Sequence, residues 1–188
     1  MDRTAFAAFA LASTLLAGAA SAAGDKSPQQ TKIERGRALV TLGGCNDCHT
    51  PLKMTPQGPA PDTARMLSGH PEQLQMPPAP ALPAGPWGFV GAATMTAWSG
   101  PWGTSFVSNI TPDPETGIGK WSEKDFVTSM RSGRHLGTGR AYLPPMPWQN
   151  LAASSDEDLS AIYAYLMSIP PVNNRVPDPI APQTPAAH

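Results

Sequence analysis

Two cysteines and a histidine in the stretch GGCNDCHTPLK constrain this chain more than any other feature. Cys45 and Cys48 are the only cysteines among the 188 residues, and His49 directly follows the second one. A C-x-x-C pair can form a redox couple, half of a zinc site, a structural disulfide or a haem attachment site. A structural zinc site needs four ligands, and this chain has no second cysteine pair, while its other histidines are scattered singly.

The haem interpretation alone gives all three residues a function. In a C-x-x-C-H motif the two thiols add to the vinyl groups of haem as thioethers, and the imidazole binds the iron. A thioredoxin-like pair should follow a strand in a βαβ pattern, and no such pattern surrounds this motif. A disulfide would leave His49 without a function. The sequence therefore predicts one covalent haem c, attached to Cys45 and Cys48, with His49 as an iron ligand.

The N-terminus predicts export. Arg3 precedes a segment of small apolar residues from Thr4 to Ala17, and the sequence Ala20–Ala22 fits a signal-peptidase site. Residues 1–22 are therefore predicted to be a signal peptide. An uncleaved membrane anchor is the alternative, but the apolar run is short for a spanning helix. Because haem c is attached outside the cytoplasm, the motif and the leader together predict a periplasmic protein without a membrane span.

Composition limits the possible classes of function. The formal net charge of −1 and the isoelectric point near 6.4 argue against a nucleic-acid surface. The 23 prolines and 17 glycines predict many loops. We expect one haem domain over residues 23–175, with an insertion at about 55–105, followed by a Pro/Ala-rich tail over 176–188.

Three helices are predicted from caps and apolar spacing. The first begins at Thr31, where Glu34 completes a possible capping box, and ends at Gly43-Gly44. The second runs from Ser122 to Gly133. The third begins at Ser154 or Ser155 and is terminated by the sequence Ile169-Pro170-Pro171.

The long segment from Thr50 to Trp121 is rich in proline, glycine, methionine and tryptophan. Its Thr104–Ile110 stretch, TSFVSNI, could form a short strand. A structureless loop of this length is uncommon in a compact domain. We therefore expect the segment to pack over one side of the haem, held by Trp87, Trp98 and Trp102, because exposed indole rings are costly.

The order of these features resembles that of class I cytochromes c. The stretches SNITPDPETGIGKWSEKDFVTSMRSGR, LPPMPWQNL and SDEDLSAIYAYLMSIPPV are similar to haem domains of bacterial periplasmic cytochromes, including cytochrome subunits of alcohol and aldehyde dehydrogenases. The resemblance covers about residues 32–54 and 108–173. It implies a small all-α fold of three to four helices around one haem, from which the long insertion departs. It also implies that the first and last helices cross closely at Gly36, with Tyr163 or Tyr165 opposite.

Met146 is the predicted sixth iron ligand. It lies in LPPMPW just before the last helix, where Pro144, Pro145 and Pro147 stiffen the loop. A thioether ligand favours ferrous iron and raises the reduction potential. Met76, which prolines also follow, is the main alternative. Ligation by His70 or His135 would give bis-histidine iron instead.

The sequence also offers candidates for further contacts to the haem. Pro51 follows the motif and could support the His49 side of the haem. The haem propionates need hydrogen-bond donors, for which Asn109 and Trp121 are candidates, together with Arg65 and Arg140.

The predicted function is one-electron transport between a dehydrogenase or respiratory donor and an acceptor protein, without enzymatic activity of its own. A second hypothesis is a cytochrome subunit fixed inside a dehydrogenase complex. A third is a haem sensor or catalytic haem, which would require an iron without a methionine ligand.

Overall fold

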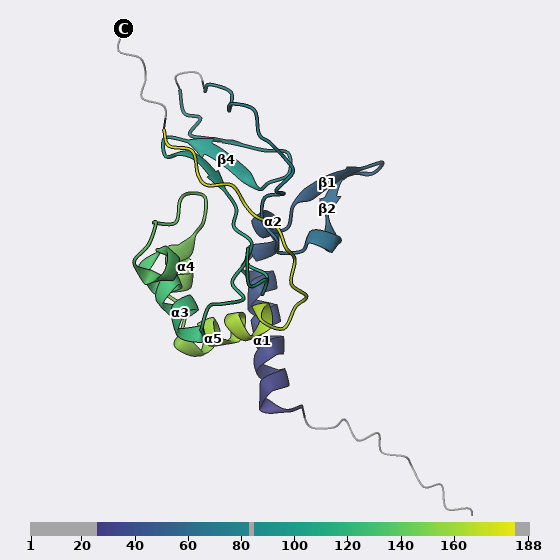
Figure 1. Cartoon of the computed structure of the whole chain (residues 1–188), viewed down its shortest axis with the longest axis vertical. Coiled ribbons are helices and arrows are strands. Elements are labelled where there is room, and N and C mark those ends of the chain that lie inside the picture. The colour runs from purple at the N-terminus through teal and green to yellow at the C-terminus, as the bar shows by residue number, and fades with distance from the viewer. Residues whose placement is uncertain (1–25, 83–84, 183–188) are drawn as a thin grey trace, which may run out of the picture.

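The protein consists of a helical part and two small antiparallel sheets (Figure 1). The computed structural model describes residues 26–82 and 85–182. The predicted signal peptide and the last residues of the predicted tail lie outside the described residues. None of the helices within the described ranges combines the length and apolar character needed to cross a membrane.

In the part of the chain that the structure describes, five α-helices form the helical part, and two short 3-10 turns accompany them. The helices are α1 (Pro28–Leu42), α2 (Cys45–His49), α3 (Glu123–Ser132), α4 (Trp148–Ala152) and α5 (Asp156–Leu166). The 3-10 turns are η1 (Thr63–Arg65) and η2 (His135–Gly137).

The helix caps explain most of these boundaries. Ser122 caps α3 in a capping box with Asp125, and Gly133 ends it in the left-handed conformation, as the sequence predicts. Ser155, one of the two predicted candidates, caps α5. The predicted start of α1 at Thr31 is wrong. Ser27 forms the capping box with Gln30 one turn earlier, which moves the start to Pro28.

Helices α1 and α5 cross at very close range (Figure 1). Gly36 is buried, and a Cβ atom added there would lie 1.9 Å from the carbonyl oxygen of Ala161 and 2.8 Å from the Cβ of Tyr165. Only glycine permits this backbone approach. Tyr165, one of the two predicted tyrosines, therefore lies opposite Gly36.

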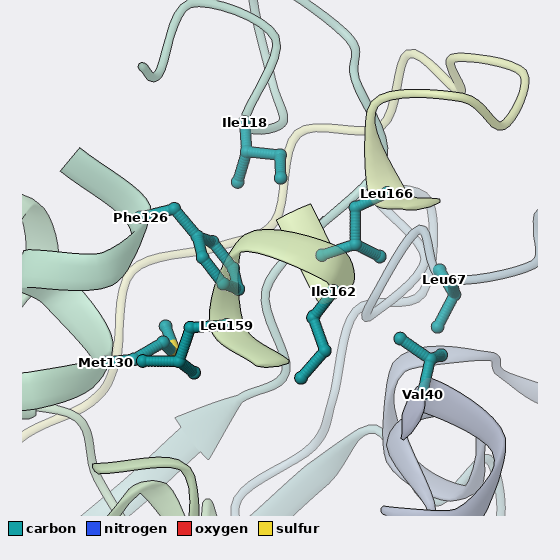
Figure 2. Packing of buried hydrophobic residues seen from close by; sticks show 8 residues of the cluster. All are labelled: Val40, Leu67, Ile118, Phe126, Met130, Leu159, Ile162 and Leu166. Carbon is teal, nitrogen blue, oxygen red and sulfur yellow. The ribbon is translucent and has the colours of Figure 1, made fainter. Parts of the chain in front are cut away.

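The core lies between α1, α3 and α5 (Figure 2). Helix α5 presents Leu159, Ile162 and Leu166 to its neighbours, at the spacing of one helix face. The other members of the buried cluster are Val40 from α1, Leu67, Ile118, and Phe126 and Met130 from α3.

The predicted all-α class I fold is wrong, because the Pro/Gly-rich segment forms two antiparallel sheets. In the first, β1 (Leu52–Thr55) pairs with β2 (Gly58–Pro61). The second has the order β3 (Val90–Gly91), β4 (Ala97–Gly100) and β5 (Gly103–Phe106).

Tight turns make these hairpins possible within a proline-rich sequence. Pro101 and Trp102 connect β4 to β5, and Gly103 adopts a φ of 90° that other residues rarely take. The prolines of the first sheet lie in a two-stranded ribbon, in which both strands are edges. The strand predicted over Thr104–Ile110 is realised only as far as Phe106. The chain is thus a mixed α/β protein.

The tryptophans of this segment are not all buried. Phe89 packs against Trp98 and Trp102, with ring centroids 5.8 and 6.1 Å apart. Trp87, in contrast, is 73% exposed. The expectation that all three indoles hold the segment is therefore wrong for Trp87.

Residues after α5 return to the sheets (Figure 1). Asn174 is buried, and its amide nitrogen donates to the carbonyl oxygens of Ser68 and His70, both at 2.8 Å. Further along, Ile180 exchanges backbone hydrogen bonds with Thr104 at the edge of β5. The C-terminal segment thereby joins the helical part to the second sheet.

The Gly36 crossing gives a first prediction. Replacing Gly36 with Ala should lower the free energy of unfolding by about 2 kcal/mol, the range found for overpacked cores. A loss of stability would indicate the close crossing, since glycine-to-alanine replacement inside a helix otherwise stabilises the protein by up to ~1 kcal/mol. Gly88→Ala is the matched control, because no atom lies within 4 Å of an added Cβ there. Urea unfolding measures both; equal stability of the two variants would contradict the close crossing.

Candidate haem attachment site

The C-x-x-C-H motif forms the short helix α2 directly after α1. Gly44 adopts a left-handed conformation with a φ of 65°, which turns the chain between the two helices. Helix α2 follows the end of α1 in the direction of the two sheets (Figure 1). The motif is therefore placed by the end of a helix that the close crossing with α5 holds in position.

Cys45 and Cys48 do not form a disulfide with each other in the structure. They are separated by three positions within α2 and so share one side of the helix. Burial raises the pKa of both thiols above the ordinary value, and the charge of Asp47 adds to the shift. A raised thiol pKa is the opposite of what activates a redox cysteine, so the thioredoxin-type alternative is disfavoured.

The zinc alternative lacks ligands. Within residues 26–82 and 85–182, no group of three or more His, Cys, Asp or Glu side chains could hold a metal ion. Cys45, Cys48 and His49 therefore do not form a group that could hold a metal ion with other side chains of the described chain.

His49 has one ring nitrogen engaged and the other available. The imidazole is 9% exposed, and Nδ1 lies 2.8 Å from the carbonyl oxygen of Ser108. Because a carbonyl can only accept, Nδ1 carries the hydrogen and Nε2 keeps its lone pair. Burial lowers the pKa of His49, and the bond to Ser108 offsets this only in part, so the neutral imidazole is favoured. In the described chain, Nε2 has no hydrogen-bond partner.

The carbonyl beside His49 comes from a distant part of the sequence. Pro51 was the sequence-based candidate for this side, and it is buried. Its carbonyl, however, accepts from the backbone of Asp62 at 2.8 Å. The carbonyl that contacts the ring of His49 is that of Ser108.

Met146 lies in a loop tied to the second sheet. Its side chain is partly buried and packs against the hydrophobic core, as does that of Cys45. The backbone N–H of Met146 donates to Leu143 at 3.2 Å. The hydroxyl of Ser105, on β5, donates to the carbonyl oxygen of Pro144 at 2.6 Å. The loop is therefore held from the insertion as well as by its own prolines.

The predicted propionate donors differ in what they contact. Asn109 is buried and donates to the Thr116 hydroxyl and the Val172 carbonyl, while its side-chain oxygen accepts from Thr111. Its amide thus joins the loop after β5 to the C-terminal segment. Trp121 packs against the core and edge-to-face against His135, with ring centroids 5.0 Å apart.

The alternative iron ligands differ in their surroundings. His70 is fully buried, and both ring nitrogens are engaged, Nδ1 with the Thr96 hydroxyl at 3.0 Å and Nε2 with the Leu74 carbonyl at 2.9 Å. His135 is exposed and packs on Trp121. Met76 is partly buried in the insertion. Of these, His70 has no free nitrogen to offer a metal.

The surroundings of the motif fit a haem. Apolar side chains from several segments are only partly buried where they pack on the core, and Cys45 is among them. They include Ile110, Trp121, Tyr142 and Met146. A haem requires apolar contacts, two thiols and an imidazole with one free nitrogen, and the described chain offers each of these groups.

Two contributing residues escape sequence reasoning. Ser105 and Ser108 act through a hydroxyl on a strand and through a backbone carbonyl. Neither belongs to a motif, and a main-chain acceptor has no sequence signal of its own. The alternation of buried residues in β5, where Gly103 and Ser105 face inward, is the one pattern that marks Ser105.

Sequence comparison identifies several bacterial relatives. The chain is 34% identical over 145 residues to a subunit of the nicotinate dehydrogenase of Pseudomonas putida, a match that covers 77% of this chain and 9% of that protein. It is 30% identical over 167 residues to the cytochrome c subunit of a quinone-type alcohol dehydrogenase of Gluconobacter oxydans, covering 87% of this chain and 27% of that subunit.

A third relative has a similar description. The gluconate 2-dehydrogenase cytochrome c subunit of Pantoea cypripedii is 30% identical over 173 residues, covering 89% of this chain and 31% of that subunit. The chain spans less than a third of the length of each of these relatives. No model of a known protein family matches it.

The attachment site gives a second prediction. The mature protein should have the mass of the polypeptide plus one haem, and acid–acetone should not extract that haem. The double variant Cys45→Ser, Cys48→Ser should release any bound haem to acid–acetone, because only the thioethers resist this solvent. Ser68→Ala, which changes a buried serine outside α2, should keep the haem covalent. Free thiols in the wild-type protein would contradict the assignment.

Proposed function

We propose that this chain, which is related to the cytochrome c subunits of bacterial dehydrogenases, is a periplasmic electron-transfer protein with one covalent haem c. The observation that carries the proposal is the geometry at α2. Two thiols share one side of a helix, and the next residue is a buried imidazole whose Nδ1 is fixed and whose Nε2 is free.

The number of haems follows from the cysteines. Each covalent attachment uses two thiols, and the chain has only Cys45 and Cys48. Each S–H adds across one vinyl group, so that two C–S bonds form and no atom is lost. A relative from Cereibacter sphaeroides is described as a dihaem cytochrome, and this chain has residues for one haem.

When bound, haem c supplies one-electron chemistry by alternating between ferrous and ferric iron. His49 would hold the iron through Nε2, while the Ser108 carbonyl fixes the ring orientation and increases the basicity of the ligand. Met146 would provide a second ligand to the iron from a loop stiffened by prolines and by Ser105. A rigid pair of ligands suits electron transfer, because little rearrangement is needed when the charge changes.

We further propose that the partner is a dehydrogenase. The relatives described as alcohol, gluconate and fructose dehydrogenase cytochrome subunits support this class of electron donor. The chain would receive single electrons from the dehydrogenase and pass them to an acceptor protein. It would not oxidise the dehydrogenase substrate itself.

A second candidate is a permanent subunit of such a complex. The exposure of large apolar side chains in the insertion favours it: Trp87 is 73% exposed and Phe89 is 49% exposed. A fixed subunit would co-elute with its dehydrogenase in gel filtration of native extract. A free carrier would elute near its own mass of 19.7 kDa less any leader.

Met146 gives the third prediction. Met146→Ala should abolish the weak near-red sulfur-to-iron charge-transfer band of the oxidised protein and lower the reduction potential. The potential should fall because a ligand that favours ferrous iron is lost, and axial identity contributes to a tuning range of about 0.8 V. The variant should also bind carbon monoxide or cyanide.

Met76→Ala is the matched control, since it removes a partly buried thioether from the insertion. It should leave the band, the potential and ligand binding unchanged. If only the Met76 variant lost the charge-transfer band, Met76 in the insertion would be the iron ligand and the assignment of Met146 would be refuted.

The fourth prediction concerns turnover. The purified protein should not oxidise alcohols, aldehydes or sugar acids, and should not reduce peroxide, in steady-state assays. Its reduction should require a dehydrogenase and that enzyme's substrate, and stopped-flow absorbance of the haem would follow the transfer. Rapid turnover by the isolated protein would favour a catalytic haem instead.

A further inference from the structure

We infer that the segment Ser105–Ser108, which begins at the end of the insertion, positions both Met146 and His49 for the iron. This inference rests on the proposed function and adds residues that determine how firmly the two ligands are held. One end of the segment contacts the loop of Met146, and the other end contacts the ring of His49.

The Met146 side depends on the hydroxyl of Ser105. Ser105 is 8% exposed, and its oxygen lies 2.6 Å from the Pro144 carbonyl and 3.3 Å from the Trp98 carbonyl. A hydroxyl has a single hydrogen, and the shorter contact is the stronger bond. The hydroxyl therefore acts mainly on the carbonyl of Pro144, which lies two residues before Met146 in the same loop.

The position of the His49 ring depends on backbone hydrogen bonds. The Ser108 carbonyl accepts from Nδ1 of His49 at 2.8 Å. The backbone of His49 is tied to the same region, because its carbonyl accepts from the N–H of Gly69 at 2.8 Å. Gly69 in turn packs so closely on Val107 that an added Cβ would lie 2.3 Å from the Val107 carbonyl.

Two backbone hydrogen bonds hold the middle of the segment. The N–H of Val107 donates to Thr96 at 2.9 Å, and its carbonyl accepts from the N–H of His70 at 2.9 Å. Thr96 and His70 are fully buried and are bonded to each other through their side chains. Residues 105 to 108 span at most about 11 Å of chain. Both contact points therefore lie on one short, firmly held piece of backbone.

The first test removes the Ser105 hydroxyl. In Ser105→Ala the Met146 loop loses one hydrogen bond, so the ferric protein should bind cyanide about fivefold more tightly, which is the usual effect of one net hydrogen bond. The charge-transfer band should weaken without disappearing. Ser105→Thr keeps the hydroxyl and should restore both readouts.

Ser68→Ala is the matched control for the first test. Ser68 is also buried, and its hydroxyl donates to the Arg65 carbonyl at 3.0 Å, away from the Met146 loop. The cyanide affinity and the charge-transfer band of the Ser68→Ala variant should stay at wild-type values. Equal cyanide affinity in the Ser105 and Ser68 variants would overturn the assignment of Ser105.

The second test asks whether the segment serves both ligands. Val107→Gly retains both backbone bonds but removes the β-branched side chain that stiffens the chain. It should weaken the charge-transfer band and also shift the hyperfine-displaced proton resonance of the His49 Nδ1–H. Val90→Gly, in β3 of the second sheet, should change neither readout. If the Val107 variant matched the Val90 variant in both readouts, the proposal that one segment positions both Met146 and His49 would be refuted.

Met146→Ala, measured alongside, separates this inference from the proposed function. If that variant loses the band while Ser105→Ala matches wild type, the axial assignment stands and the positioning role of Ser105 fails. If Met146→Ala keeps the band, the axial assignment itself fails, whatever the Ser105 variant does.

Discussion

The close approach of α1 and α5 at Gly36 determines where the C-x-x-C-H helix lies. The backbone of Ala161 occupies the space that any side chain at position 36 would need. This contact holds α1 across α5, and the buried faces of the two helices pack beside it through Val40, Ile162 and Leu166. Helix α2 begins three residues after α1 ends, so the orientation of α1 also sets the position of the two thiols.

The second structural requirement is a fixed ring for His49, which the helical part does not provide. The Ser108 carbonyl that orients the imidazole follows β5, and the loop carrying Met146 is held by Ser105 on the same strand. Strand β5, at the end of the insertion, and the residues after it are therefore part of the framework of the site. The position of the insertion is held in turn by Asn174 and by the pairing of Ile180 with Thr104, which tie the C-terminal segment to it.

This arrangement separates two tasks within one chain. The helices supply the thiols and the apolar core, while the sheet and its following loop orient the groups that would bind iron. Large apolar side chains of the insertion, Trp87 and Phe89, are exposed, and under the proposed function they are available to a partner protein. A cytochrome that works beside a dehydrogenase needs both properties, because its ligands must stay rigid while its surface is recognised.

Local features of the structure were predictable from local sequence. The Cys45–His49 motif, the box of Ser122 with Asp125 and the stop at Gly133 all depend on residues within a few positions of one another. The close crossing at Gly36 was also predictable, although through the resemblance to class I cytochromes c. The start of α1 was wrong by one turn because two possible capping boxes overlap in sequence, and Ser27 satisfies the free N–H groups earlier than Thr31 does.

The sequence by itself determined the C-x-x-C-H motif and the caps of α3 and α5, because each depends on residues within a few positions of one another. Tertiary structure decided the two sheets, the exposure of Trp87 and the choice of Ser108 over Pro51 beside His49. These depend on which distant backbone groups become paired. A carbonyl oxygen is the same in every residue, so the path of the folded chain selects its hydrogen-bond partner. The sequence alone does not reveal that partner.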